Sequence, residues 1–223
     1  MGEKIAVILL AAGSSSRMDG IKKEFHKLKT GSSVLGTSAL TFASVSEIYT
    51  IVIAVQEGME EKTREALPPV LFSGQNQLIK FVTGGKTRSA SVFNALSFLS
   101  QSNPDYVLIH DGARPWVSAS LVKELISGVK KHNAVIPLIT ITDTPKEHDG
   151  INVIKHLKRA NVGIAQTPQA FQFTQILRAH EEAQKVNEEF TDDAEIWGRF
   201  EGKVACISGE ADNKKITFPE DLN

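Results

Sequence analysis

The sequence predicts an α/β fold: a doubly wound, mainly parallel sheet with helices on both faces. Short runs of β-branched apolar residues alternate along the chain with longer stretches whose apolar residues recur every three or four positions. The apolar runs show little polar alternation, which is typical of strands covered on both faces. A chain of 223 residues is long enough to bury a full core.

The predicted elements follow the ends of these runs. The strands are expected at 5–10 (IAVILL), 48–55 (IYTIVIAV), 78–82 (LIKFV), 106–109 (YVLI), 134–139 (AVIPLI) and 204–207 (VACI). The helices, each with apolar residues at three- and four-residue spacing, are expected at 34–43, 60–67, 89–99 and 121–131. Ser118 and Ser120 are candidate N-caps for the last helix. No repeat or linker divides the chain, so residues 1–223 are predicted to form a single domain.

One segment interrupts this alternation. Residues 140–165 are polar, and Asp149-Gly150 lies between two β-prone stretches. Asp-Gly between short strands predicts a tight hairpin turn. The hairpin is either a surface feature of one subunit or an arm that reaches onto a partner subunit, and composition favours neither interpretation.

Composition excludes several classes of protein. The 25 Lys and Arg residues are balanced by 26 Asp and Glu residues, which argues against a strongly basic nucleic-acid-binding domain. No apolar run approaches the roughly 18 residues of a membrane helix. The single cysteine, Cys206, cannot form an internal disulfide framework and suits a reducing compartment. We therefore expect an intracellular globular protein with no membrane or nucleic-acid partner.

The first candidate site follows strand 5–10. The small residues at 11–16 (AAGSSS) would let backbone N–H groups approach a phosphate, and the serines add donors. The segment is neither a Walker A loop nor a G-x-G-x-x-G fingerprint. Arg17 and Lys23 would add positive charge. The pattern predicts a polyphosphate site, with a strand-to-helix turn flanked by solvated cations as the alternative.

Two further clusters follow predicted strands. Residues 83–92 (TGGKTRSASV) open a helix, so their N–H and hydroxyl groups could bind a base or sugar, or could form a simple turn. In 109–115 (IHDGARP), Asp111 comes at the carboxyl end of a strand, where ligands bind in open α/β sheets. Its carboxylate could hold Mg²⁺, and Arg114 could bind a second phosphate. The alternative is an ion pair between Asp111 and Arg114.

Together these segments resemble the 2-C-methyl-D-erythritol 4-phosphate cytidylyltransferases of the non-mevalonate isoprenoid pathway. The matching segments occur in the family's order over nearly the whole chain: LLAAGSSSRM, KKEF, GGKTRSASV, IHDGARP, DTPK, QTPQAF, TDDA and ADNKKITFPEDL. The resemblance implies a Rossmann-like nucleotidyltransferase fold, a homodimer joined through the arm at about 140–165, and a bacterial cytoplasmic enzyme. In the implied reaction the substrate phosphate attacks the α-phosphorus of CTP, pyrophosphate leaves, and 4-diphosphocytidyl-2-C-methyl-D-erythritol forms.

The resemblance also implies roles for individual residues. The catalytic cations would be Arg17 and Lys23 at the α-phosphoryl group and Lys215 at the CTP phosphates. Contacts to CTP would come from Ala12, Gly13, Ser14, Gly84, Arg88 and Ser91. The methylerythritol phosphate would meet Asp111, Arg114, Thr144, Arg159 and Thr191, with Thr144 and Arg159 supplied by the other subunit's arm. Mg²⁺, or another hard divalent cation, would face Asp111 and Asp212.

The chain departs from the family pattern at one catalytic segment. Where the family usually reads Pro-Lys-Gln, this chain has Lys22-Lys23-Glu24, and the loop from Arg17 is one residue shorter. Either lysine could therefore take the catalytic place, and Lys23 is preferred because Phe25 matches the aromatic residue that follows. Two other functions stay open: a ribitol-5-phosphate cytidylyltransferase, which would share the CTP half of the site, and a non-catalytic CTP-binding protein.

Overall fold

The computed structural model describes residues 2–15, 18, 20, 22–73, 78–186 and 188–222. Within these residues the strands are β1 Ile5–Leu10, β2 Ile48–Val55, β3 Ile79–Thr83, β4 Tyr106–Asp111, β5 Ala134–Thr140, β6 Lys146–His148, β7 Val153–His156, β8 Gly163–Ala165, β9 Gln169–Gln172 and β10 Ala205–Ser208. The α-helices are α1 Val34–Ala43, α2 Glu60–Ala66, α3 Arg88–Leu99, α4 Ala119–His132, α5 Phe173–Ala183 and α6 Asp193–Phe200. All the predicted strands and helices are present, with ends that differ by at most two residues.

The main sheet is doubly wound, as the sequence predicts. Its strand order is β10-β5-β9-β4-β1-β2-β3, and β8 pairs with β5 outside this path. The pairs β1–β2, β1–β4, β2–β3 and β5–β10 are parallel, whereas β9 runs antiparallel to both β4 and β5. Because β1 lies between β2 and β4, the loops that leave these strands at their carboxyl ends share one edge of the sheet.

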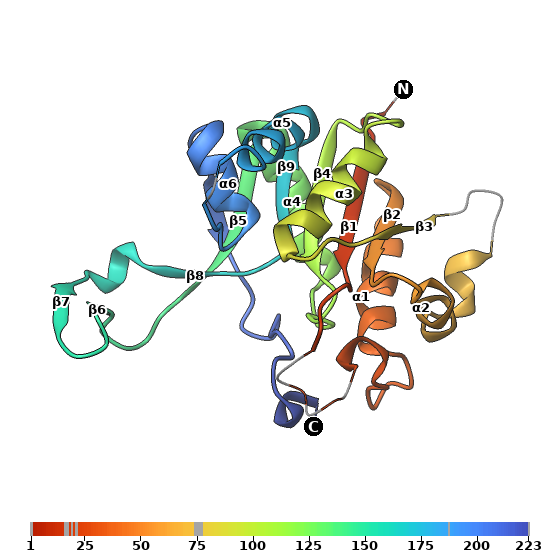
Figure 1. Cartoon of the computed structure of the whole chain (residues 1–223), viewed down its shortest axis with the longest axis horizontal. Coiled ribbons are helices and arrows are strands. Elements are labelled where there is room, and N and C mark those ends of the chain that lie inside the picture. Colours follow the sequence, from red (N-terminus) through yellow and green to blue (C-terminus); the bar gives the residue numbers. More distant parts are fainter. Residues whose placement is uncertain are drawn as a thin grey trace.

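Helices cover both faces of this sheet (Figure 1). Along β1, Val7 and Leu9 point to the face that packs against α1 and α4, while Ala6 and Ile8 point to the face covered by α3, α5 and α6. Successive residues of a strand point to opposite faces. The run of β-branched residues is therefore continuous because both faces are buried.

Among the described residues, side-chain caps lie at the start of five α-helices, including α1, α3 and α4. Ser33 begins α1 by accepting a hydrogen bond from the Gly36 N–H, and Thr87 begins α3 through the Ala90 N–H. Of the two candidate caps for α4, Ser118 is the one that accepts from the Leu121 N–H. Capping satisfies N–H groups that have no partner inside the helix, typically contributing about 1 kcal/mol each.

The region between the arm and β10 contains elements that our sequence analysis left unassigned. β9 inserts a four-residue strand, QAFQ, between β4 and β5, and α5 and α6 follow it. The short polar-flanked strand gives little periodic signal, whereas α5 buries Phe173, Ile176 and Ala179 at helical spacing. The helices were therefore detectable from the sequence, and the antiparallel strand was not.

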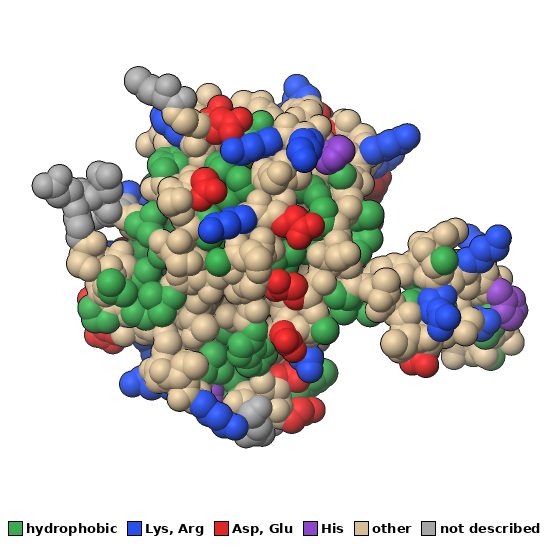
Figure 2. Space-filling view, turned by 180° about the vertical axis from the view of Figure 1, so that it is seen from behind, with side chains coloured by type: hydrophobic (Ala, Val, Ile, Leu, Met, Phe, Trp, Pro, Cys, Tyr) green, Lys and Arg blue, Asp and Glu red, His purple; other side chains and the backbone are tan. Residues whose placement is uncertain are grey.

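The hairpin predicted around Asp149-Gly150 is present as the antiparallel pair β6–β7. It projects away from the body of the molecule (Figures 1 and 2), and every residue of its two strands is exposed. The face drawn in Figure 2 also shows positive and negative side chains interspersed. Among the described residues, no helix is long and apolar enough to cross a membrane.

Candidate active site

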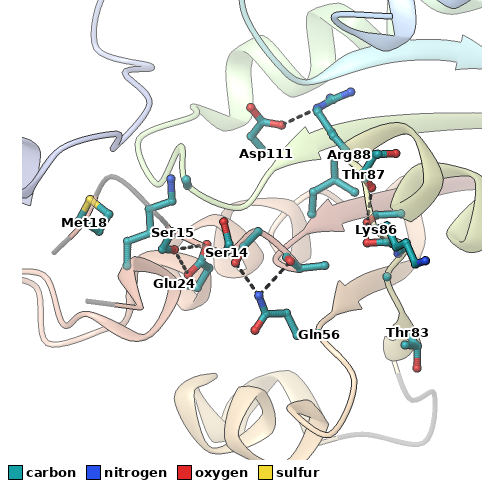
Figure 3. A pocket seen from close by; sticks show the side chains of 18 of the residues that line it. Ser14, Ser15, Met18, Glu24, Gln56, Thr83, Lys86, Thr87, Arg88 and Asp111 are labelled. Carbon is teal, nitrogen blue, oxygen red and sulfur yellow. Dashed lines mark hydrogen bonds and ion pairs between the residues drawn. The ribbon is translucent and has the colours of Figure 1, made fainter. Parts of the chain in front are cut away.

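A cavity of about 690 Å³ lies at the carboxyl edge of the sheet (Figure 3). Its wall includes the turn after β1, Gln56 after β2, the segment 83–88 after β3 and Asp111 at the end of β4. Lys23 and Lys215 also line it, although they lie far apart in the sequence. The fold therefore brings the predicted strand-end clusters together around one cavity.

The turn after β1 and the loop after β3 touch each other at glycine. A Cβ atom placed on Gly84 would lie 2.4 Å from the Cβ of Ala12, and one on Gly85 would lie 2.4 Å from the Cβ of Ala90. Such distances are too short for any larger residue without a backbone shift. Gly84 therefore lets the turn after β1 approach the loop after β3, and Gly85 lets that loop pack against the first turn of α3.

Lys22 and Lys23 have different surroundings, although they are adjacent in the divergent triplet, Lys22-Lys23-Glu24. Lys23 lines the cavity, and its Nζ donates a hydrogen bond to the backbone O of Ile216 at 3.0 Å. Lys22 instead donates from Nζ to the Oε1 of Gln56 at 2.9 Å. This arrangement favours Lys23 as the cation available to a ligand in the cavity.

Comparison with known proteins identifies the family. The family model described as IspD, 2-C-methyl-D-erythritol 4-phosphate cytidylyltransferase, matches residues 5–223. The chain belongs to this family. It is 35% identical over 219 residues to the 2-C-methyl-D-erythritol 4-phosphate cytidylyltransferase of Clostridioides difficile, a match that covers 98% of this chain and 90% of the relative.

A second relative and a solved structure agree with this membership. The cytidylyltransferase of the same name from Geobacillus kaustophilus is 36% identical over 217 residues, covering 96% of this chain and 92% of the relative. The crystal structure of 4-diphosphocytidyl-2C-methyl-D-erythritol synthase from Anaerococcus prevotii superimposes with a TM-score of 0.86 at 30% identity. That match covers 99% of this chain and 93% of the other.

Asp111 is the centre of the charge network in this cytidylyltransferase cavity. Its Oδ1 lies 3.3 Å from Nε of Arg88, and its Oδ2 lies 2.7 Å from Nζ of Lys215. Burial opposes ionisation of the carboxyl group, but Arg88 and Lys215 outweigh it and hold the pKa of Asp111 well below its ordinary value. Asp111 is therefore an anion over the whole physiological pH range.

The ion pair that we considered as an alternative, Asp111 with Arg114, is not the one formed. Arg114 donates from Nη1 to the backbone O of Asn213 at 2.8 Å, and burial lowers its pKa. The true partners of Asp111 are Arg88 and Lys215. The sequence places Arg114 three residues from Asp111, yet the fold turns its guanidinium toward the C-terminal segment.

A buried pair behind the cavity anchors Arg88. Asp193, at the first turn of α6, accepts from Arg88 Nη1 at 2.8 Å and lies 3.1 Å from Nε2 of His180 on α5. Asp193 and Asp111 together outweigh burial and raise the pKa of Arg88 above its ordinary value. Neither Asp193 nor His180 is predicted from the sequence, because a paired carboxylate and imidazole on separate helices leave no local motif.

The family-implied residues divide into two groups. The residues that line the cavity are Ala12, Gly13, Ser14, Lys23, Gly84, Arg88, Ser91, Asp111 and Lys215. Those outside its lining are Arg114, Thr144, Arg159, Thr191 and Asp212. Arg17 lies outside the described residues, so its predicted role rests on the sequence alone.

Arg159 and Thr191, in the second group, form hydrogen bonds with residues that do not line the cavity. Thr144 and Arg159 belong to the arm segment, where Arg159 Nη1 donates to the Thr142 carbonyl at 2.6 Å. Thr191 donates from Oγ1 to Glu195, and Asp212 is exposed. Of the predicted acceptor-binding residues, Asp111 therefore lines the cavity, whereas Arg114, Thr144, Arg159 and Thr191 lie outside its lining.

His110 has a structural role in the fold. It is fully buried, with Nε2 3.1 Å from the Arg114 carbonyl and Nδ1 3.1 Å from the Thr167 hydroxyl. Burial lowers its pKa to about 4. The ring is therefore neutral at physiological pH, and Nε2 carries the proton because a carbonyl oxygen can only accept.

This neutral histidine predicts a pH-dependent stability. Between about pH 6.5 and pH 4 the unfolded chain binds a proton at His110 that the folded chain does not, so stability falls as the pH falls. The loss over this range is about 3 kcal/mol. We expect His110→Gln to be less stable at pH 7, with the difference from the original chain shrinking toward pH 4. Urea unfolding at pH 7, 6, 5 and 4 measures this, and a constant difference would contradict it.

Proposed function

We propose that this chain transfers the cytidylyl group of CTP to 2-C-methyl-D-erythritol 4-phosphate. The observation that carries the proposal is the cavity in which Lys23, Arg88 and Lys215 meet the small-residue turn after β1. Lys86 also lines the cavity, and a chain of this family with these four cations around one cavity is suited to a substrate that carries several phosphates.

The reaction requires the protein to position the two substrates and to stabilise the negative charge that develops on them. An oxygen of the acceptor phosphate forms a bond to the α-phosphorus of CTP, the bond from that phosphorus to the bridging oxygen breaks, and pyrophosphate leaves with the electron pair. Lys23 and Lys215 stabilise the negative charge that grows on the phosphoryl oxygens, and we assign Arg17 the same task from the sequence. Gly84 and Ser91, which also line the cavity, are proposed to bind the cytosine and ribose.

A hard divalent cation such as Mg²⁺ is part of the proposal. Asp111 is ionised and lines the cavity, and its two oxygens retain lone pairs beyond the bonds to Arg88 and Lys215. Among the described residues, no group of three His, Cys, Asp or Glu side chains could hold a metal by itself. This donor set fits a cation that takes one carboxylate and otherwise phosphate oxygens and water. Such a cation would neutralise phosphate charge. Asp212 is exposed, so it could bind the cation only from the surface of the protein.

The proposed function has a direct test. The purified chain incubated with CTP, Mg²⁺ and 2-C-methyl-D-erythritol 4-phosphate should release pyrophosphate, whereas the same mixture with ribitol 5-phosphate should not. Turnover of ribitol 5-phosphate alone would identify the other cytidylyltransferase. CTP binding without turnover of either acceptor would indicate the non-catalytic alternative. A cytoplasmic location is also proposed, since a single cysteine suits a reducing compartment.

The arm is proposed to join two subunits into a homodimer. Its apolar side chains Ile151, Val153 and Ile154 are 92%, 53% and 57% exposed. Exposed apolar side chains on a projecting hairpin are typical of an association surface. The partner's arm would then bring Thr144 and Arg159 to the acceptor phosphate.

This dimer predicts a strong effect of one arm substitution. Ile151→Asp should weaken association at least about tenfold, because a charge replaces an apolar side chain in the buried surface. The KM for the acceptor should rise while CTP affinity stays unchanged. Sedimentation equilibrium measures association, and Val70→Asp, at another exposed apolar position, is the matched control. A dimer of undiminished stability in Ile151→Asp would rule out the arm as the contact.

A further inference from the structure

The side-chain amide of Gln56 links the turn after β1 to Lys22. Its Nε2 donates to the backbone O of Ala12 at 3.2 Å and to that of Gly13 at 2.9 Å, as Figure 3 shows. Its Oε1 accepts from Nζ of Lys22 at 2.9 Å. Gln56 follows β2 directly and lines the cavity, so a residue fixed to the sheet holds the turn.

The partners of Gln56 determine which way its amide points. A lysine ammonium can only donate a hydrogen bond, and a backbone carbonyl can only accept one. Lys22 therefore fixes Oε1 on its own side and presents both Nε2 hydrogens to the turn. Without Lys22, the amide would lose the contact that orients it.

The bonds from Gln56 also orient the next two N–H groups of the turn. In a trans peptide, the C=O of one residue and the N–H of the next point in opposite directions. Because the carbonyls of Ala12 and Gly13 face Gln56, the N–H groups of Gly13 and Ser14 point away from it. Within the described part of the chain, neither N–H donates to a protein acceptor. Gly13 and Ser14 line the cavity, so two donors remain for a ligand there.

A second contact ties the same turn to the divergent triplet. The Oγ of Ser15 donates to Oε2 of the buried Glu24 at 3.1 Å. Lys22 and Glu24 are the two triplet positions at which this chain departs from the Pro-Lys-Gln usual in the family it resembles. Both of these residues are therefore connected to the turn: Lys22 indirectly, through Gln56, and Glu24 directly, by its hydrogen bond from Ser15.

We propose that Gln56, oriented by Lys22, is a positioning residue that holds the turn with the N–H groups of Gly13 and Ser14 directed at the triphosphate of CTP. The ligand class rests on the proposed function. Two adjacent N–H groups on a turn of small residues form an anion-binding concavity. The two lysines then have separate tasks: Lys22 maintains the shape of the turn, and Lys23 contributes charge inside the cavity.

Binding measurements on the purified chain test this proposal. Gln56→Leu removes both donors at similar volume, and Gln101→Leu makes the same change at an exposed position away from the cavity. The probes are CTP, inorganic tripolyphosphate and cytidine, each titrated calorimetrically and by competition. Gln56→Leu should lower the affinity for CTP and for tripolyphosphate about tenfold each and leave the affinity for cytidine unchanged. Gln101→Leu should bind all three like the original chain.

The role of Lys22 is tested by combining substitutions. Lys22→Met should lower the affinity for tripolyphosphate less than Gln56→Leu does. The double variant should bind tripolyphosphate no more weakly than Gln56→Leu, because Lys22 acts through Gln56. Lys22→Arg, which keeps a donor, should restore binding. An additive double variant would overturn the assigned role of Lys22.

Other outcomes separate this inference from the proposed function. If Gln56→Leu binds tripolyphosphate as the original chain does, or loses cytidine as strongly as CTP, the positioning role is wrong. If the original chain binds tripolyphosphate but neither binds CTP nor releases pyrophosphate, the proposed function fails, and the comparison with tripolyphosphate still decides the role of Gln56.

Discussion

Replacing Lys23 with methionine is expected to lower kcat by about 100- to 1000-fold, while CTP affinity falls much less. Removing one group that stabilises charge in the transition state typically costs about 3–4 kcal/mol. Lys23 is suited to this task because it lines the cavity, held at 3.0 Å from the Ile216 carbonyl. A cation already in place spends little free energy on reorganisation when charge develops.

Pyrophosphate release at saturating CTP gives kcat, and calorimetry gives the CTP dissociation constant. Lys27→Met, at an exposed position of the same segment, is the control and should leave both quantities unchanged. Lys22→Met should raise the KM for CTP with little change in kcat. A strongly reduced kcat in Lys22→Met together with an unchanged kcat in Lys23→Met would show that Lys22 is the catalytic lysine.

Replacing Asp111 with asparagine should reduce both activity and stability. The substitution keeps the size of the side chain but removes the charge shared by Arg88 and Lys215. Breaking a buried charge network by removing one partner costs about 3–5 kcal/mol, because the remaining charges are left uncompensated. We expect the free energy of unfolding to fall by about 3 kcal/mol at pH 7. We expect kcat/KM to fall about 100-fold and the Mg²⁺ concentration for half-maximal activity to rise.

The stability effect of Asp111 should depend on pH in a defined direction. Its pKa is lower in the folded chain than in the unfolded chain, so the unfolded chain binds more protons as the pH falls below about 4. The stabilisation is therefore fully present above the unfolded pKa and is lost as the pH falls toward the folded one. The difference between the original chain and Asp111→Asn should be constant from pH 5 to pH 8 and shrink in stronger acid.

Asp105→Asn is the matched control for this measurement. Asp105 lies just before the start of β4, at the opposite end of the strand from Asp111, and accepts from the Lys4 N–H at the exposed edge. It should show a small stability change and unchanged kinetics. Equal losses in Asp105→Asn and Asp111→Asn would mean that the negative charge on this strand matters, and not the network with Arg88 and Lys215.

Much of the fold could be predicted from the sequence because burial on both faces leaves a local signal. The runs that became β1 and β2 are predicted to the residue, since few polar residues fit a doubly covered strand. β9 could not be predicted, because a four-residue strand is defined by its neighbours β4 and β5 and not by its own pattern. Asp149-Gly150 predicted the hairpin turn of the arm, but the sequence of the arm did not predict what the arm contacts.

The site was predictable to the extent that it lies at strand ends. Ala12 to Ser14, Gly84 and Asp111 each follow or end a strand that the sequence reveals, and parallel strands bring their carboxyl ends to one edge. Gln56 also follows a strand, but a lone glutamine carries no signal until the carbonyls of Ala12 and Gly13 are seen beside it. His180 and Asp193 are hidden for the same reason.

The sequence by itself determined which strand-end segments supply the candidate site, because hydrophobic periodicity fixes where each strand stops and which polar residues come next. Only the tertiary structure decided how their charges pair. Asp111 takes Arg88, 23 residues away, in place of Arg114, three residues away. Electrostatic attraction depends on separation in space, and the folding of distant segments sets that separation without leaving a trace in their spacing along the chain.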